Sequence, residues 1–252
     1  MLATTRVGDG EKTFALLHGV FGRGSNWRSI ARGLVERRPG WSALLVDLRL
    51  HGDSLDLAGP HTVETAARDV CELGPIHALA GHSFGGKIAI EAARELPALE
   101  ELWVLDAMPG PRPDRRGSEA IAKVIAALRA VGTRFESRDA YVSALAAHGL
   151  ATPIGRWLAM SLRRIDGGFE KAVDVDAIDT MLDDYFRRDL WPVLEALPMR
   201  RHLVIAERSP VFAPEDRERA DRLEGVCVHR VDSGHWLHVE APDALLDILS
   251  AS

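Results

Sequence analysis

Ser83 lies in the segment GHSFGG, where an apolar run ends and an amphipathic helical pattern begins. A sharp turn from a strand into a helix would expose the Ser83 hydroxyl, and Gly81 and Gly85 would leave room for the strained backbone. The same turn would direct the N–H group of Phe84 and the positive end of the helix toward an oxyanion forming at Ser83. An ordinary loop serine is the alternative, so the nucleophile hypothesis needs a partner that activates the hydroxyl.

A histidine must act as that partner, because a serine hydroxyl alone is a poor nucleophile. Of ten histidines, His235 is the best candidate: it follows the last apolar run in a Gly-containing loop and precedes a helix that begins near Pro242. His238 is the nearest rival, but it comes three residues later, where the chain should already enter that helix. His82 should point away from Ser83 at the turn, and we expect a structural role for it.

Backbone N–H groups near the end of another strand would complete an oxyanion hole. The segment LLHGVFGRGSNW ends such a strand, and the Val20 N–H is the predicted donor, with the Phe21 N–H as the alternative. In DLRLHGDS we expect Asp47, Arg49 and His51 to order a loop. His51 with Asp53 has no third ligand nearby, so this segment predicts no metal site.

These residues need a scaffold that brings strand ends together, and the remaining sequence supplies one. Short apolar, β-rich runs alternate with helical patterns, which is typical of an α/β fold with a mostly parallel central sheet flanked by helices. Between residues 112 and 194 only helical patterns occur. We therefore predict a core formed by residues 1–111 and 195–252, with residues 112–194 inserted as an all-helical cap.

Composition narrows the function classes. The chain has 252 residues, 46% hydrophobic and 27% charged, which is typical of a globular protein. A net charge of -6 without basic clusters argues against nucleic acid as a partner. Without a signal-peptide pattern or a long apolar run, we expect a soluble, cytoplasmic protein that does not bind membranes, as a monomer or homodimer. Cys71 and Cys227 are expected to be buried free thiols.

Four motifs in order, LLHG, DLRLHGDS, GHSFGG and GHWLHVEAPD, resemble the α/β-hydrolase superfamily over essentially the whole chain. The combination of LLHGVFGRGSNW with GHWLHVEAP is most similar to small bacterial carboxylesterases and their mitochondrial abhydrolase-domain relatives. The resemblance implies a catalytic serine at Ser83, a catalytic histidine at His235 and a helical cap over the site.

The acid of the expected triad does not lie in its usual place. Most superfamily members carry it after the penultimate core strand, where this chain reads HLVIAERSP and places Ser209. Asp106 in ELWVLDAMPG ends the strand that follows the nucleophile helix, and the esterase subgroup resembles this chain in using an aspartate there. We predict Asp106 as the acid, with Glu207 as the alternative; Asp106 could also merely cap backbone N–H groups.

Together these residues predict a serine hydrolase that cleaves esters or thioesters of small to medium acyl chains through an acyl-enzyme, without cofactor or metal. The alternatives are a cofactor-free haloperoxidase or perhydrolase, a C–C bond hydrolase of the same superfamily, and a hydrolase-like ligand receptor. The side chains predicted to line the substrate pocket are Phe21 and Trp236 from the core and Trp157, Met160, Phe169, Met181, Tyr185, Phe186 and Trp191 from the cap. For each of the cap residues, packing within the cap is the alternative.

Overall fold

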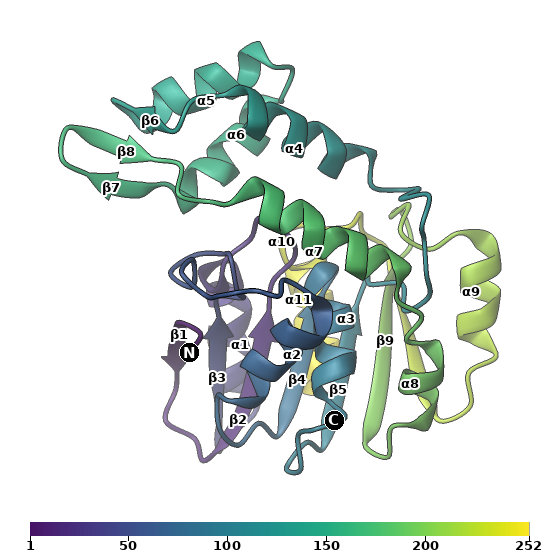
Figure 1. The fold of residues 1–252 in the computed structure, drawn as a ribbon. Helices are drawn as coiled ribbons and strands as arrows, with labels where there is room; N and C mark the ends of the chain where they lie inside the picture. The colour runs from purple at the N-terminus through teal and green to yellow at the C-terminus, as the bar shows by residue number, and fades with distance from the viewer. Residues whose placement is uncertain (252) are drawn as a thin grey trace.

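A seven-stranded sheet forms the centre of the molecule, with the strand order β1-β3-β2-β4-β5-β9-β10 (Figure 1). The computed structural model describes residues 1–251. Only β1 pairs antiparallel with its neighbour, so the prediction of a mostly parallel sheet is confirmed. The strands are β1 (Thr4–Val7), β2 (Lys12–Leu17), β3 (Trp41–Val46), β4 (Ala78–His82), β5 (Glu101–Leu105), β9 (Arg200–Ala206) and β10 (Val226–Val231).

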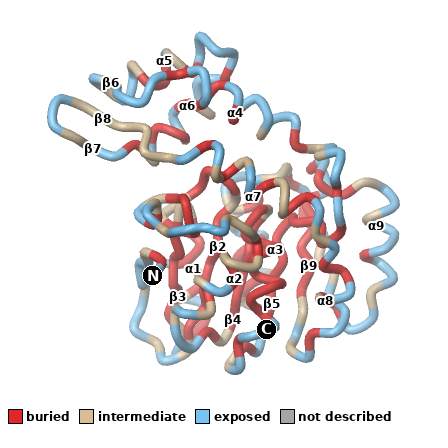
Figure 2. The backbone as a smooth tube through the Cα atoms, in the orientation of Figure 1, coloured by how far each residue is buried: buried red, intermediate tan, exposed pale blue. Residues whose placement is uncertain are grey.

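Helices cover both faces of this sheet, because alternate strand residues point to opposite sides. Phe14 and Leu16 belong to the apolar cluster under α1 and α11, whereas Ala15 and Leu17 belong to the cluster under α2 and α3. Figure 2 shows the strands as mostly buried. The core helices are η1 (Gly24–Trp27), α1 (Arg28–Arg37), α2 (Val63–Cys71), α3 (Phe84–Ala92), α8 (Trp191–Ala196), α9 (Pro214–Asp221), α10 (Leu237–Glu240) and α11 (Pro242–Ser250).

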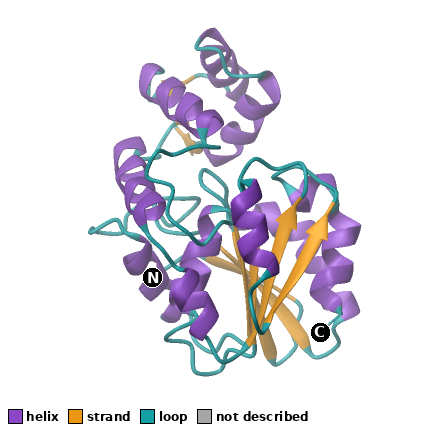
Figure 3. Cartoon of the chain, turned by 90° about the vertical axis from the view of Figure 1, so that its right-hand side faces the viewer, coloured by secondary structure: helices purple, strands orange, loops and turns teal. Residues whose placement is uncertain are grey.

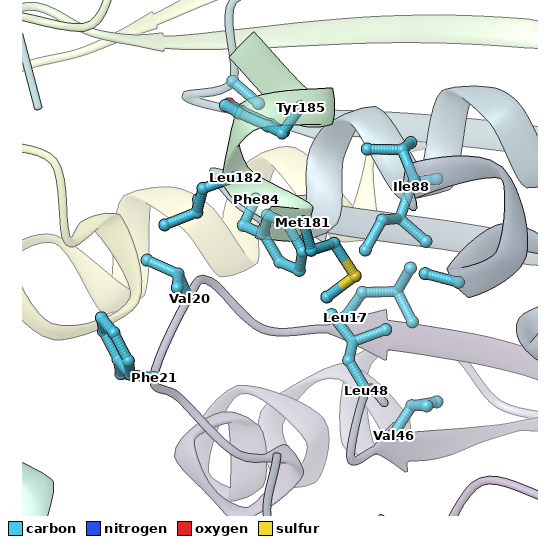
Figure 4. Close-up of a cluster of buried hydrophobic side chains, with 14 of the residues drawn as sticks. Leu17, Val20, Phe21, Val46, Leu48, Phe84, Ile88, Met181, Leu182 and Tyr185 are labelled. Carbon is cyan, nitrogen blue, oxygen red and sulfur yellow. The ribbon is translucent and has the colours of Figure 1, made fainter. Parts of the chain in front are cut away.

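The cap lies beyond the carboxyl ends of the parallel strands, toward which the strand arrows point in Figure 3. It contains α4 (Glu119–Ala130), α5 (Arg138–Ala147), α6 (Thr152–Leu158), η2 (Ala159–Ser161) and α7 (Val175–Arg187). Its long helix α7 crosses above the core (Figure 1). In Figure 4 Met181, Leu182 and Tyr185 of this helix lie beside Phe84 and Val20. The cap therefore contacts the two segments predicted to donate N–H groups to an oxyanion.

The prediction that this insertion is all helical was wrong. A three-stranded antiparallel sheet of order β6-β8-β7 lies within it, formed by β6 (Arg134–Phe135), β7 (Arg163–Ile165) and β8 (Gly168–Glu170). Gly167 and Gly168 have positive φ angles of 78° and 154° and allow the tight reversal between β7 and β8. A Cβ atom on Gly168 would lie 2.2 Å from the Phe135 carbonyl oxygen, so glycine is also needed for the close approach of β6.

The cysteines also differ from expectation. Both thiols are free, but Cys227 is exposed and Cys71 is only half-buried. Cys227 lies on β10, which ends the sheet order and leaves one side without a neighbouring strand. Cys227 is therefore exposed because it lies on an edge strand, although its apolar neighbours in the sequence suggested burial.

No helix within residues 1–251 is both long and apolar enough to span a membrane.

Candidate active site

Ser83 occupies a strained turn between β4 and α3. Its φ and ψ angles are 52° and −116°, outside the regions that serine ordinarily adopts. The Ser83 N–H donates to the Leu105 carbonyl oxygen at 2.9 Å, which ties the turn to β5. A Cβ atom on Gly81 would lie 2.1 Å from the Gly85 carbonyl oxygen, and one on Gly85 would lie 2.7 Å from that of His18. The two glycines thus permit close backbone contacts on which the turn depends.

Asp106 follows β5 and is completely buried, with a φ angle of 43°. Its Oδ2 atom lies 2.7 Å from Nδ1 of His235, and its Oδ1 accepts a hydrogen bond from the Ala206 N–H at 3.1 Å. The Asp106 N–H in turn donates to the Val204 carbonyl oxygen at 2.7 Å. Both carboxylate oxygens therefore have partners, and β9 holds the residue in place.

The alternative acid, Glu207, lies elsewhere. Its side chain is exposed and lies 3.7 Å from Arg230 rather than near His235. Ser209, at the usual acid position, is buried, and its hydroxyl accepts a hydrogen bond from the Val211 N–H. The structure therefore brings Asp106, and not Glu207, to the His235 ring.

The loop that carries His235 is held from both sides. The His82 Nε2 atom donates to the His235 carbonyl oxygen at 2.7 Å. The Glu240 carboxylate accepts hydrogen bonds from the N–H groups of Gly234 and Trp236, at 2.8 and 3.4 Å. Burial and the nearby His235 and His238 hold the pKa of His82 well below 6.5, so His82 is neutral at neutral pH. Sequence reasoning missed Glu240.

His238, the rival base, packs its ring against Trp27 at a centroid distance of 4.7 Å. Burial, and secondarily His235, lower its pKa to about 4. No carboxylate within residues 1–251 is hydrogen-bonded to it, and its Nδ1 is buried without a partner. His238 therefore lacks the orienting carboxylate that His235 has.

The loop after β2 passes directly against the turn, since a Cβ atom on Gly19 would lie 3.4 Å from the Ser83 Cβ. The Phe21 N–H donates to Nε2 of His51 at 3.0 Å and is therefore engaged. In the described chain neither the Val20 N–H nor the Phe84 N–H donates to a protein group. The geometry thus leaves Val20 rather than Phe21 free to donate.

Buried histidines stabilise this loop. His18 accepts the Leu48 N–H at Nε2 and donates from Nδ1 to the Gly19 carbonyl oxygen. His51 likewise donates from Nδ1 to the Arg49 carbonyl oxygen. Burial lowers the pKa of His51 to about 4, and that of His18 falls well below 6.5 because of burial and the neighbouring His51. Both rings are therefore neutral at neutral pH, and each can accept a backbone N–H.

Asp47 and Arg49 hold the same region through polar contacts. Asp47 accepts hydrogen bonds from the N–H groups of Gly24 and Asp53, at 2.6 and 2.9 Å. The Arg49 guanidinium pairs with Asp69 at 2.6 Å. No cluster of metal-ligating side chains occurs in residues 1–251.

A cavity of about 620 Å³ opens between the core and the cap. Ser83, Phe84, Val20 and His235 all line it, so the predicted nucleophile, base and N–H donors share one chamber. Ser83 Oγ makes no hydrogen bond with His235 in the described chain; such contacts often tighten only when substrate binds. Of the predicted pocket residues, Phe21, Trp157, Tyr185, Phe186 and Trp236 line the cavity.

Four of the apolar residues predicted for the pocket do not line it. Met160 is 46% exposed outside the cavity, because it belongs to the short η2 helix and not to the inner side of α6. Phe169 lies on β8, and Met181 and Trp191 are buried within the main apolar cluster. Residues that line it without having been predicted as pocket residues include Trp27, Arg112, Ile121, Val124, Leu182 and Val211.

Comparison with known proteins gives a consistent family. A family model described as the alpha/beta hydrolase family matches residues 14–248. The sn-1-specific diacylglycerol lipase ABHD11 of Xenopus tropicalis is 30% identical over 244 residues, covering 89% of this chain and 72% of that protein. Its counterpart in Xenopus laevis is 29% identical over 253 residues, covering 93% and 77%. A solved structure titled marine microorganism esterase has a TM-score of 0.84 at 23% identity, covering 98% and 97% of the two chains.

Proposed function

The chain belongs to the alpha/beta hydrolase family, and from this premise we propose that it is a serine hydrolase that cleaves carboxylic esters or thioesters. Ser83 is the nucleophile, His235 the general base and Asp106 the acid that orients His235. The observation that carries the proposal is the 2.7 Å contact between Asp106 Oδ2 and His235 Nδ1 in a chamber that Ser83 also lines. A buried carboxylate at Nδ1 leaves Nε2 unprotonated and able to accept the serine proton.

In the proposed reaction His235 accepts the Ser83 proton while the serine oxygen attacks the carbonyl carbon. The N–H groups of Val20 and Phe84 stabilise the oxyanion, each lowering the barrier by roughly 3 kcal/mol. His235 then gives its proton to the departing alcohol or thiol, which leaves Ser83 acylated. A water molecule, deprotonated by His235, attacks the acyl group and releases a carboxylic acid and free Ser83.

The cavity supports small to medium acyl chains as substrates. Its volume of about 620 Å³ lies within the range of pockets for small molecules, and most of its lining side chains are apolar. The relatives named diacylglycerol lipase are consistent with an ester substrate. The same triad could serve perhydrolase or C–C hydrolase chemistry, so the test must measure which bond breaks.

The test is a panel of p-nitrophenyl esters and acyl thioesters with 2 to 16 acyl carbons, assayed with wild type, Ser83→Ala and Ser143→Ala. Ser143 lies exposed on α5, far from the proposed machinery, and serves as the matched control. We expect Ser83→Ala to lose essentially all turnover and fluorophosphonate labelling, while Ser143→Ala retains both. Folded wild-type protein that neither reacts with the probe nor cleaves any ester would refute the proposal.

A further inference from the structure

Arg112 is a buried cation in the wall of the proposed active-site cavity. It is 5% exposed, and it is the only lysine or arginine among the described residues that line the chamber. Burying a charge is costly unless other groups compensate it. The position of Arg112 therefore requires an explanation that an exposed arginine would not.

The protein compensates this charge only in part. Nη1 of Arg112 donates to the main-chain oxygens of Arg116 and Val211, at 3.2 and 3.3 Å. The guanidinium also lies above the Phe186 ring, with Cζ 5.4 Å from the centroid. Within residues 1–251 no carboxylate pairs with Arg112, so the Nε and Nη2 donors lack the acidic partner that such a fork ordinarily binds.

The two neighbouring arginines provide the contrast. Arg115 lies 2.9 Å from Asp179 and 2.6 Å from Asp183, and Arg116 lies 3.0 Å from Glu215. Both are far more exposed than Arg112, yet both have carboxylate partners. Acidic residues are thus available nearby, but none of them forms an ion pair with Arg112, the arginine that lines the cavity.

The acidic groups closest to the chamber are already engaged. Glu240, the only carboxylate among the described lining residues, accepts N–H groups from Gly234 and Trp236. Asp106 binds His235 and the Ala206 N–H. Neither carboxylate pairs with Arg112, so an anionic partner for this guanidinium has to come from outside the described chain.

Tyr185 adds a second donor beside Arg112. Burial raises the pKa of Tyr185, whereas the charge of Arg112 and a hydrogen bond from it act in the opposite direction. The neutral phenol oxygen accepts from Arg112, and its O–H can still donate to an anion. Its ring lies 5.6 Å from that of Phe84, the residue next to Ser83. The Tyr185 side chain therefore links Arg112 to the residue that would donate to the oxyanion.

The positions of Trp236 and Arg112 in the cavity indicate where the alcohol and acyl parts of an ester would bind. Trp236 is 38% exposed and adjoins His235, which would protonate the leaving group, so this side of the chamber is the exit. Arg112 lies in the wall beside Gly117 and Val211, and Tyr185 connects it to Phe84. This part of the chamber suits the acyl group, which keeps its carbonyl oxygen at the proposed Phe84 N–H donor after the alcohol leaves.

We infer that Arg112, with Tyr185, binds a carboxylate at the far end of the acyl group, so that the preferred substrates are monoesters or monothioesters of dicarboxylic acids. This inference rests on the proposed function, because it assigns specificity to the same site. Arg112 acts here as a specificity-determining residue that contacts the substrate away from the reacting atoms.

The test compares matched ester pairs that differ only in the terminal group. The pairs are p-nitrophenyl hexanoate with mono-p-nitrophenyl adipate, and p-nitrophenyl octanoate with mono-p-nitrophenyl suberate. The readout is the ratio of kcat/KM for the acidic ester to that for the neutral ester. We expect a wild-type ratio above one that falls at least ten-fold in Arg112→Gln, mainly through KM, and recovers in part in Arg112→Lys. Arg116→Gln, the matched surface control, keeps the wild-type ratio.

A wild-type ratio of one or less, or an Arg112→Gln variant whose ratio is unchanged, overturns the inference. If Arg112→Gln does not fold, inhibition of the wild type decides: adipate must inhibit hexanoate ester cleavage at least ten-fold more strongly than adipamide, and equal inhibition refutes the proposal. If no ester is cleaved at all, the proposed function fails separately, and calorimetric titration of adipate into wild type and Arg112→Gln still tests the anion site.

Discussion

Asp106 and His235 are 129 positions apart in the chain, yet their Oδ2 and Nδ1 atoms lie 2.7 Å apart. The contact arises because β5 and β10 end at the same edge of a parallel sheet, with β9 between them. Asp106 is also bound to the Ala206 N–H at the end of β9, so the carboxylate cannot turn away from the ring. This pair is the basis of the first prediction.

Asp106→Asn should lower kcat by about 10⁴-fold, because the amide favours the wrong His235 tautomer and cannot stabilise its protonated form. Steady-state kinetics with the best ester from the panel measures the effect. Glu207→Gln is the matched control and should stay within a factor of two, since Glu207 is exposed beside Arg230. A large loss in Glu207→Gln with an active Asp106→Asn would move the acid role to Glu207.

The candidate catalytic residues could be located from the sequence because each of them follows a strand. Ser83, Asp106 and His235 each follow an apolar run, and a parallel sheet necessarily brings such positions to one edge. The contact of Arg112 with Val211 could not be predicted in this way, because the acceptor is a main-chain oxygen from a distant segment, which no residue type encodes. The β7–β8 hairpin was missed for a different reason: its strands have three residues each, too few for an alternating pattern, although Asp166-Gly167-Gly168 was a usable turn signal.

Gly81→Ala should damage the turn at Ser83. The new Cβ would lie 2.1 Å from the Gly85 carbonyl oxygen, and backbone atoms on both sides cannot yield as a flexible side chain would. We expect the free energy of unfolding to fall by about 3 kcal/mol and ester cleavage to be lost with it. Gly132→Ala is the matched control, because a Cβ atom on Gly132 would meet no other atom within 4 Å. Urea denaturation compares the two; equal stabilities would show that the close approach is not needed.

His51 should make the protein sensitive to acid. Its pKa is lowered by burial from 6.5 to about 4, so the unfolded chain binds more protons between these two values. The free energy of unfolding therefore decreases as the pH falls from 6.5 toward 4, by a total of about 3 kcal/mol from this residue. Protonated Nε2 could no longer accept the Phe21 N–H, so the oxyanion loop would loosen in the same pH range.

Urea denaturation at pH 7.5, 6.0, 5.0 and 4.0 tests this. His51→Gln should be less stable than wild type at pH 7.5 but should lose less stability on acidification. His148→Gln, an exposed histidine in the cap, should follow the wild-type pH dependence. An unchanged pH slope in His51→Gln would mean that other groups cause the acid sensitivity.

Lys87 connects the helix that follows the nucleophile to both ends of the cap insertion. It is 1% exposed, and its Nζ donates to the main-chain oxygens of Gly110, Tyr185 and Arg188, each at 2.8 Å. Gly110 precedes the cap, and the other two residues lie at the end of α7, so one ammonium group joins α3 to the chain where it enters and leaves the cap.

Lys87→Met keeps much of the side-chain volume but leaves three carbonyl oxygens without their donor. We expect the free energy of unfolding to fall by about 3 kcal/mol, because buried acceptors without partners are costly. Limited proteolysis should cleave the cap faster than in wild type, while Lys123→Met, on the exposed side of α4, should change neither property. A Lys87→Met protein with wild-type stability and wild-type protease resistance would show that packing alone, such as that of Met181 and Tyr185 on the core, holds the cap in place.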